Sequence, residues 1–252
     1  MSEDSRRNDK IPVVQMLVVG FIASALGIAL GLAIDWFPEQ GSTQAEDIDT
    51  LWDILVIASV PIFVMVQCVV LFSVWKFRMR PGEELKDGPP IHGNTKLEIV
   101  WTAIPAIILV GLCSYAYVVL IDIEKEPADE MTVNVTGQQF AWSFEYPGAS
   151  GGKPVRSDQL YLPEDGNVRF KIKSLDVIHD FWVPQFRMKV DAVPGVTTSY
   201  RVRTKGTGEY QVVCAELCGL GHSTMRQSAH VLSAAKFDQW MTKQRQEAAA
   251  QS

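Results

Sequence analysis

Apolar residues are gathered into three uncharged stretches in the first half of the chain. They run from Ile11 to Ile34, from Ile54 to Trp75 and from Ile99 to Ile121, which is 24, 22 and 23 residues. A helix needs about 20 residues to cross the roughly 30 Å hydrocarbon core of a membrane. Buried helices of water-soluble proteins rarely stay uncharged for so long. The second and third stretches therefore predict two membrane-spanning helices, and the first stretch predicts a third.

The first stretch has a second interpretation. It follows a short polar segment that contains Arg6, Arg7 and Lys10, and a secretory signal also begins this way. The apolar core of a signal is usually shorter, about 7–15 residues, although Gly31–Ala33 could serve as a weak cleavage site. We favour a retained helix and keep a cleaved leader as the alternative.

The two loops between these stretches differ in charge. The segment from Asp35 to Asp53 holds six acidic residues and no Lys or Arg. The segment from Lys76 to Lys96 holds five basic residues, namely Lys76, Arg78, Arg80, Lys86 and Lys96. Because basic loops stay in the cytoplasm, we expect everything from Asp122 onward to lie on the outer face of a bacterial-type plasma membrane.

After the third stretch the pattern changes to short runs rich in β-branched and aromatic residues, separated by Gly, Pro and Asp. Such runs predict an antiparallel β-sandwich or barrel, and residues 234–250 predict a terminal helix. The expected strands are Met131–Thr136, Phe140–Tyr146, Val168–Ser174, Val177–Val183, Thr197–Thr204, Glu209–Val213 and Gln227–Leu232. The chain thus divides into an N-terminal segment (1–48), a helical hairpin (49–122), a β domain (123–233) and a C-terminal helix and tail (234–252).

Overall composition narrows the class of protein only a little. The 252 residues include 29 acidic and 23 basic ones, a net charge of −6, and this argues against a partner nucleic acid, which favours a basic surface. Four cysteines are too few for a disulfide scaffold of this size. Two of them, Cys68 and Cys113, lie in the apolar stretches, where we expect them to act as packing residues.

The other two cysteines belong to the most informative segment of the chain. Within twelve residues it holds Cys214, Cys218, His222 and Met225. A thiolate, an imidazole and a weak thioether form the ligand set of blue copper sites, and two thiolates four residues apart can bridge two metal ions. Each ion then needs one imidazole, and His179, at the head of an expected strand, is a better second candidate than His230.

Two other interpretations of this segment remain open from the residues alone. Cys214 and Cys218 could form a local disulfide on the oxidising side of the membrane. The same two cysteines with His179 and His222 could hold a tetrahedral zinc ion. Met225 and the position of the loop between two strands argue against zinc.

Three motifs make the chain resemble subunit II of the heme–copper cytochrome c oxidases, from about Asp49 to Trp240. The family pattern Cys-x-Glu-x-Cys-x3-His-x2-Met is matched from Cys214 to Met225. The pattern Asp-Val-x-His followed by Val-Pro is matched from Asp176 to Pro184, and Lys-x-Asp-Ala-x-Pro-Gly from Lys189 to Gly195.

This resemblance implies membrane helices followed by a cupredoxin-like Greek-key β-sandwich or barrel that holds the dinuclear copper centre CuA. It implies two bridging cysteines, one histidine for each copper and two weak outer ligands: Cys214, Cys218, His179, His222, Met225 and the backbone carbonyl of Glu216. The side chain of Glu216 is expected to point toward a Mg site shared with subunit I.

The implied role is in a terminal oxidase that is both an oxidoreductase and a proton translocase. The chain would accept electrons from cytochrome c and pass them to heme in subunit I, where oxygen is reduced, with subunit III as a further partner. It would hold no catalytic residue of the oxygen chemistry itself. Since no Cys-x-x-Cys-His motif follows the β region, the cytochrome donor is expected to be a separate protein.

Three further residues carry weaker expectations. Glu98, in a Glu-x-x-Trp-Thr element, is a candidate for the mouth of a proton pathway, or else an ordinary carboxylate at a helix start. Phe140 stands where many members of the family have the tryptophan through which electrons enter. Phe140 and Trp142 are therefore candidates for electron entry, or else packing residues of a strand.

Three rival functions share part of this pattern. A quinol-oxidase subunit has the same architecture but lacks the copper ligands. A copper carrier would favour exposed, exchangeable ligands and would not need two long helices. The copper domain of another respiratory reductase is disfavoured by the element around Glu98.

Overall fold

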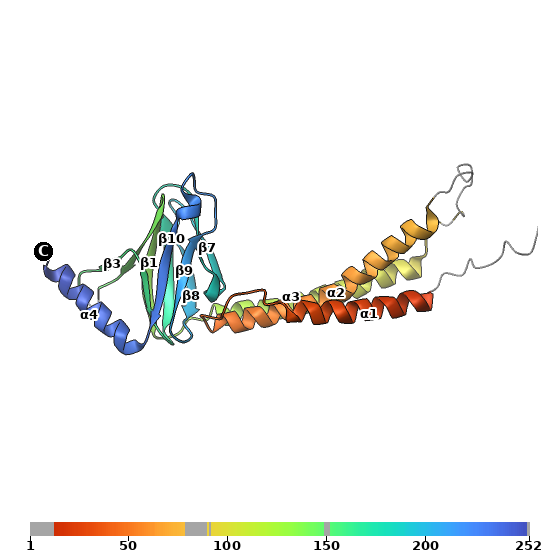
Figure 1. Ribbon diagram of the computed structural model, residues 1–252, viewed down its shortest axis with the longest axis horizontal. Coiled ribbons are helices and arrows are strands. Elements are labelled where there is room, and N and C mark those ends of the chain that lie inside the picture. The colour runs from red at the N-terminus through yellow and green to blue at the C-terminus, as the bar shows by residue number, and fades with distance from the viewer. Residues whose placement is uncertain (1–12, 79–89, 91, 149–151, 251–252) are drawn as a thin grey trace, which may run out of the picture. The chain divides into compact units, whose positions relative to one another are not determined.

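The computed structural model describes residues 13–78, 90, 92–148 and 152–250 (Figure 1). They fall into two compact units, one made of residues up to Asp35 together with Leu51–Ser114, the other of Trp36–Thr50 together with residues from Tyr115 onward. Of the basic residues that set the expected orientation, Arg80 and Lys86, like Arg6, Arg7 and Lys10, lie outside the described residues. The expected domain limits remain a prediction.

Three long helices match the three apolar stretches: α1 (Val13–Ala33), α2 (Gln44–Phe77) and α3 (Thr95–Ile123). All three are long and apolar enough to span a membrane. Their large apolar side chains face outward, with Leu17 67%, Phe63 65% and Ile107 72% exposed. A helix that is apolar on every side requires an apolar surrounding, which agrees with the predicted spans.

Helix α1 packs closely against α2. Gly27 and Gly31, one turn apart on α1, face Val60 and Val56 of α2, and a Cβ atom at either glycine would lie 2.8 Å from a valine methyl group. Small residues spaced in this way let two helices approach within a membrane. Helix α1 is therefore closely packed against α2. That it is retained in the mature protein stays a prediction.

The second unit is a sandwich of two five-stranded sheets. One sheet has the order β3-β2-β1-β5-β8 and the other the order β4-β10-β9-β6-β7. The strands are β1 (Glu130–Gln138), β2 (Ala141–Tyr146), β3 (Val155–Ser157), β4 (Leu160–Pro163), β5 (Asn167–Ser174), β6 (His179–Val183), β7 (Met188–Ala192), β8 (Thr198–Arg203), β9 (Gly208–Cys214) and β10 (Arg226–Leu232). All seven expected strands are present, and β3, β4 and β7 were not predicted.

Most strand pairs are antiparallel, as expected, but two are not. Strands β1 and β5 pair in parallel, as do β4 and β10. Strand alternation nonetheless builds the core as expected, because every second residue of a strand points to the same face. On β2 these residues are Trp142, Phe144 and Tyr146, all at most 2% exposed.

The C-terminal helix α4 (Ala234–Ala250) begins and ends where the sequence predicted (Figure 1). It buries Phe237 and Met241 against the sandwich. The ring of Trp240 stacks on Tyr161, with 4.3 Å between centroids, and meets Tyr146 edge-on at 5.2 Å. These aromatic contacts attach α4 near Tyr146, the last residue of β2.

Residues 36–50, which include the start of α2, are bound to the β unit. The guanidinium of Arg187 donates to both carboxylate oxygens of Asp49, at 2.7 and 2.8 Å, and to the carbonyl of Pro38 at 2.8 Å. It also lies over the ring of Phe37, 4.7 Å from the centroid. Ser42 is fully buried. Residues 36–50 are thus an integral part of the β unit.

Candidate metal centre

The β-sandwich brings five of the expected donor side chains together at one end. His179 is the first residue of β6, and Cys214 is the last residue of β9. These two strands are neighbours, with Phe181 opposite Cys214, so the imidazole reaches the thiol across the sheet. The loop from Cys214 to Met225 then folds back to β10 and adds the remaining donors.

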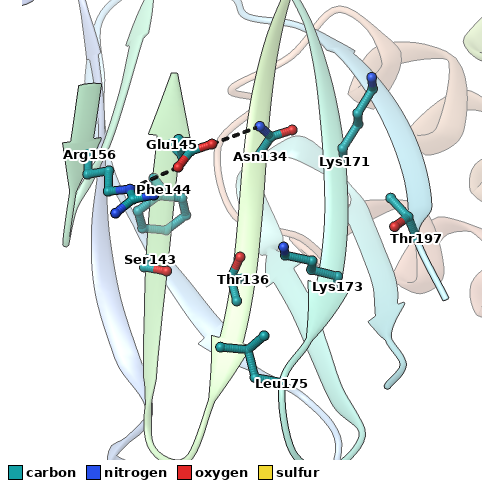
Figure 2. Close-up of a pocket in the computed structure, with 10 residues that line it drawn as sticks. All are labelled: Asn134, Thr136, Ser143, Phe144, Glu145, Arg156, Lys171, Lys173, Leu175 and Thr197. Atoms are coloured by element: carbon teal, nitrogen blue, oxygen red, sulfur yellow. Dashed lines mark hydrogen bonds and ion pairs between the residues drawn. The ribbon is translucent and has the colours of Figure 1, made fainter. Parts of the chain in front are cut away.

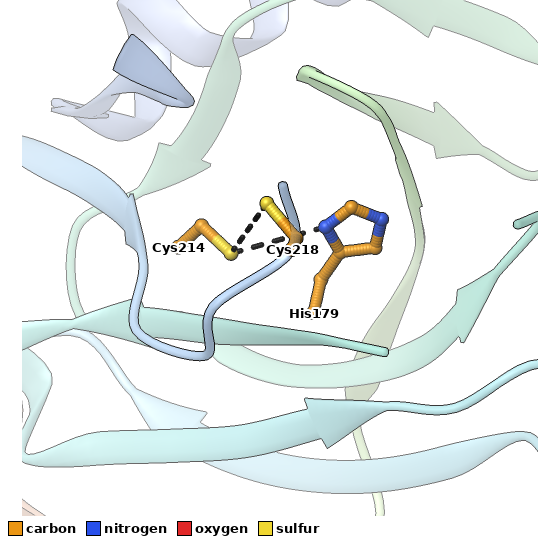
Figure 3. A group of neighbouring side chains, drawn as sticks. All are labelled: His179, Cys214 and Cys218. Carbon is orange, nitrogen blue, oxygen red and sulfur yellow. Dashed lines mark hydrogen bonds between the residues drawn. The ribbon is translucent and has the colours of Figure 1, made fainter. Parts of the chain in front are cut away.

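The donor atoms form a continuous group. Figure 3 shows the ring of His179 pointing toward the two sulfurs, with Nδ1 3.8 Å from Sγ of Cys214. The two Sγ atoms are 3.9 Å apart. On the far side of Cys218, its Sγ lies 3.6 Å from Nδ1 of His222 and 3.9 Å from Sδ of Met225. Each cysteine therefore has one histidine beside it, and the cysteines lie between the two histidines.

The backbone supplies one more oxygen. The carbonyl of Glu216 lies 3.3 Å from Sγ of Cys214, while the Glu216 side chain is exposed. His179 and Met225 are 0% exposed, and Cys214 and Cys218 are 3% and 4% exposed. Most of the donor side chains are thus shielded from water. Such shielding is expected of a site that does not exchange its ligands.

This geometry bears on the alternatives left open above. Both cysteines are free, and their 3.9 Å separation is far from the roughly 2.05 Å of a disulfide bond. Structural zinc sites close with four ligands, whereas five side chains and a carbonyl gather here. Two thiols with imidazoles and a thioether are the soft donors that select copper, so the residues fit copper and not zinc.

Burial changes the acidity of the thiol in the middle of the group. Desolvation, and after it the neighbouring thiol of Cys214, raises the pKa of Cys218 to about 11. A metal binds the thiolate and not the thiol. The protein alone therefore holds Cys218 protonated at neutral pH, and a bound cation would have to displace that proton.

A carboxylate orients the ring of His179. Asp176 Oδ1 lies 2.8 Å from Nε2 of His179 and accepts from the backbone N–H of Val177 at 2.7 Å. Its Oδ2 accepts from the N–H of Gln139 at 2.8 Å. Although partial burial opposes ionisation, these hydrogen bonds lower the pKa of Asp176 to about 2. The carboxylate is therefore charged at neutral pH and directs the other ring nitrogen, Nδ1, toward the sulfurs.

Sequence reasoning gave Asp176 no role beyond its place in a motif, and it gave none to Gln139. The side-chain amide of Gln139 donates to the carbonyl of Cys218 at 2.6 Å. An aspartate three residues before a histidine could have suggested the first contact. Gln139 offered no such signal, because it lies 79 residues from Cys218 in the chain.

The two electron-entry candidates both lie against this centre but differ in exposure. Phe140 is 39% exposed, and its ring covers the metal loop so closely that a Cβ atom at Gly221 would lie 2.5 Å from it. Trp142 is 1% exposed, and its ring centroid is 5.8 Å from that of His179. The position of Phe140 is thus at the surface, and that of Trp142 in the core.

Glu98 and His230 lie in other surroundings. Glu98 accepts the backbone N–H of Asn94 at 3.2 Å, while Asn94 accepts that of Leu97, an arrangement that caps the start of a helix. His230 stacks on Tyr161 at 4.9 Å, and its Nε2 lies 2.9 Å from Oε1 of Gln159. As the sequence suggested, His230 does not join the donor group.

A surface hollow of about 480 Å³ lies on the outer face of the sheet that contains β1, β2 and β5. Figure 2 shows its mostly polar lining, in which Glu145 accepts hydrogen bonds from Arg156 at 2.9 Å and from Asn134 at 3.4 Å. The bond from Arg156 is the main reason that the pKa of Glu145 is lowered. No cysteine or histidine lines this hollow, so it lacks the soft donors of the metal centre.

The fold and the centre together define a membrane-anchored copper protein with a β-sandwich domain. Two family models match the chain: cytochrome c oxidase subunit II, periplasmic domain, over residues 153–231, and the transmembrane domain of the same subunit over residues 28–119. The chain belongs to the cytochrome c oxidase subunit II family. Its sandwich is accordingly cupredoxin-like and periplasmic.

Two relatives agree with this assignment in sequence. Cytochrome c oxidase subunit 2 of Thermostichus vulcanus is 32% identical over 92% of this chain and 86% of its own length. The protein of the same name from Synechocystis sp. is 28% identical over 92% of this chain and 83% of its own length. A crystal structure of the periplasmic domain of subunit II of cytochrome oxidase of Bradyrhizobium japonicum is 26% identical, covers 48% of this chain and 97% of that one, and has a TM-score of 0.44.

Proposed function

We propose that this chain is the electron-accepting subunit of a terminal cytochrome c oxidase and that its copper is the dinuclear centre CuA. Cys214 and Cys218 would bridge two copper ions, and His179 and His222 would each bind one. Met225 and the backbone carbonyl of Glu216 would be the weak outer ligands. The observation that carries this proposal is the placement of each histidine beside a different sulfur of a close cysteine pair.

The bound copper would supply one-electron redox chemistry, taking electrons from cytochrome c and passing them to heme in subunit I. The residues of this chain keep that chemistry confined to electron transfer. They surround the centre with a closed set of donors, most of them buried, and a catalytic metal site would instead keep a position open for substrate. Hydrogen bonds from neighbouring loops hold the donors in place, which limits the rearrangement that accompanies each electron.

The remaining assignments extend from this role. The exposed side chain of Glu216 would contribute to a Mg site shared with subunit I, and subunit III would complete the oxidase. Phe140, exposed over the metal loop, would lie on the entry route from cytochrome c, with Trp142 behind it. Glu98 would lie at a proton pathway in addition to capping its helix. The domain limits would be 1–48, 49–122, 123–233 and 234–252, with the copper domain outside the plasma membrane and proton pumping coupled to oxygen reduction.

The rival functions fit the site less well. A quinol-oxidase subunit would not need this complete set of donors. A copper carrier would need donors that a second protein can reach, and His179, Cys214, Cys218 and Met225 are buried. The ligand set alone does not separate an oxidase from another respiratory reductase, but the match to the oxidase family over both the membrane and periplasmic parts does.

Electron paramagnetic resonance of the copper-loaded full chain in detergent tests the proposal. Hyperfine structure from one unpaired electron shared between two copper nuclei is expected, at two coppers per chain. Cys218→Ser should give a mononuclear signal or none, whereas the matched control Cys113→Ser, in α3, should leave the signal unchanged. A mononuclear spectrum in the unaltered chain would contradict the dinuclear assignment.

A further inference from the structure

Three loops that are distant in the sequence are linked through the side chains of Asp176 and Gln139. The loop between β5 and β6 contributes Asp176 itself, and the turn between β1 and β2 contributes Gln139. The loop after β9 contributes Cys218, whose carbonyl accepts the side-chain amide of Gln139 at 2.6 Å. One carboxylate is therefore connected to both halves of the donor group, directly to His179 and through Gln139 to Cys218.

The contacts of this carboxylate are directional. It receives the N–H groups of Val177 and Gln139 at 2.7 and 2.8 Å, and Nε2 of His179 at 2.8 Å. An ionised carboxylate can only accept hydrogen bonds, so Nε2 must carry a hydrogen atom. In the neutral imidazole the other nitrogen, Nδ1, then has its lone pair free, and it is Nδ1 that faces the cysteine sulfur.

We infer that Asp176 is the positioning residue of the copper centre: it fixes the tautomer and orientation of His179, sets the reduction potential of the copper, and through Gln139 aligns the loop of Cys218. This inference rests on the proposed role of His179 and Cys218 as copper ligands. The physical reason is general, since a carboxylate hydrogen-bonded to a ligating imidazole fixes its tautomer and raises its basicity.

The histidine of the pair is buried, whereas the aspartate lies at the surface. The side chain of His179 is 0% exposed and that of Asp176 is 26% exposed. A negative charge 2.8 Å from a ligating imidazole stabilises the oxidised and more positive state of the metal, although its exposure to water weakens the effect. The unaltered protein should therefore have a lower reduction potential than a variant that lacks the charge.

The principal experiment compares Asp176→Asn with the unaltered full chain, both loaded with copper in detergent. Asparagine offers one acceptor and one donor in place of two acceptors, so it cannot satisfy His179 and Gln139 together. We expect the potential to rise by about 60 mV, which is a roughly tenfold change in the one-electron equilibrium constant. Gln139→Ala keeps the carboxylate and should shift the potential several-fold less while altering the copper hyperfine splitting.

Asp129→Asn is the matched control for the loss of one negative charge. Asp129 accepts a hydrogen bond from the side chain of Asn167 at 3.1 Å and lies just before the start of β1, whereas Gln139 follows its end. Its removal should leave the potential and the spectrum unchanged. An equal shift in both variants would overturn the inference, because net charge alone would then explain it.

A second measurement needs neither copper nor a variant. Nitrogen-15 NMR of the copper-free protein should show the hydrogen of His179 on Nε2, and a hydrogen on Nδ1 would overturn the inference. If Asp176 instead served as a docking charge for the electron donor, Asp176→Asn would raise the KM for cytochrome c at low salt with an unchanged potential, and this result too would overturn it. If the unaltered chain gave no dinuclear spectrum, the proposed function would fail first, and the two failures are thereby distinguishable.

Discussion

Near each end of strand β6 an aspartate contacts the side chain of a histidine or an arginine. The two contacts have different roles. At the start of β6, Asp176 contacts His179 at 2.8 Å. Beyond its end, Asp49 receives two bonds from Arg187 at 2.7 and 2.8 Å. The first pair joins residues three apart and borders the metal donors, whereas the second joins residues 138 apart and attaches segment 36–50.

The difference lies in the charge that each aspartate faces. The guanidinium of Arg187 is permanently charged and its side chain is 5% exposed, so without Asp49 a buried charge would lose its partner. The imidazole of His179, by contrast, can make its hydrogen bond to Asp176 in the neutral form. The same kind of contact thus supports folding at one end of the strand and metal chemistry at the other.

The largest expected effect comes from breaking the pair that supports folding. Arg187→Ala removes the guanidinium, frees the Pro38 carbonyl and leaves Asp49 without its cationic partner, with only the side-chain amide of Gln40 donating to it at 2.9 Å. Breaking a buried ion pair in this way costs about 3–5 kcal/mol, which chemical denaturation of the full chain in detergent would measure. The copper spectrum of the protein that remains folded should not change.

Arg226→Ala is the control for this prediction, since Arg226 is an exposed residue of β10. It should change the free energy of unfolding by less than about 0.5 kcal/mol. If Arg187→Ala were no more harmful than Arg226→Ala, segment 36–50 would not be held to the β unit by this ion pair.

The next effect is on copper at the other end of the strand. His179→Ala should weaken copper binding by at least about 100-fold, or about 2.7 kcal/mol, because the centre loses one of its two imidazoles. His230→Ala should leave copper binding unchanged, because its ring contacts Tyr161 and Gln159. Copper titration of both variants distinguishes them, and equal copper affinity in the two would remove His179 from the ligand set.

The smallest effect concerns an ion pair that lies at the surface. The Arg156 side chain is 79% exposed, so Arg156→Ala should cost only about 0.2–1 kcal/mol at neutral pH. Its bond lowers the pKa of Glu145 below the usual 4.5. The contribution is therefore present above pH 4.5 and is lost as the pH falls through the lowered pKa of the folded protein.

Denaturation curves of the two proteins at several pH values check this sign. They should differ at pH 7 and should converge at strongly acidic pH. A difference that grew on acidification would mean that Arg156 stabilises the protein by a route other than the charge of Glu145.

Local pattern was sufficient for much of the fold. The membrane helices follow from runs of uncharged residues, and α4 from its composition, because a helix is built from contacts within a few residues. The strands with clear alternation, such as β2 and β5, were predicted for the same reason. Strands β3 and β4 have only three and four residues, which is too short for alternation to identify them. Strand β7 has five residues, as many as the predicted β6, and was missed although its residues alternate between buried and exposed.

Pairing between strands could not be read in this way. Parallel pairing of β1 with β5 and of β4 with β10 joins segments separated by other strands, and no local signal specifies it. The attachment of segment 36–50 was likewise missed, because Asp49 in the sequence looked like one more charge of an acidic loop.

The candidate site shows the same division between what the local sequence indicated and what the fold decided. The sequence by itself indicated the candidate donors, through the segment from Cys214 to Met225 and through the family motifs, and it determined the membrane anchor, because all of these are local patterns. Only the tertiary structure decided which histidine lies beside which sulfur, that Asp176 faces Nε2 of His179, and that Gln139 reaches Cys218. These contacts depend on where the loops of the two sheets meet, and that meeting is set by strand pairing and core packing over the whole sandwich.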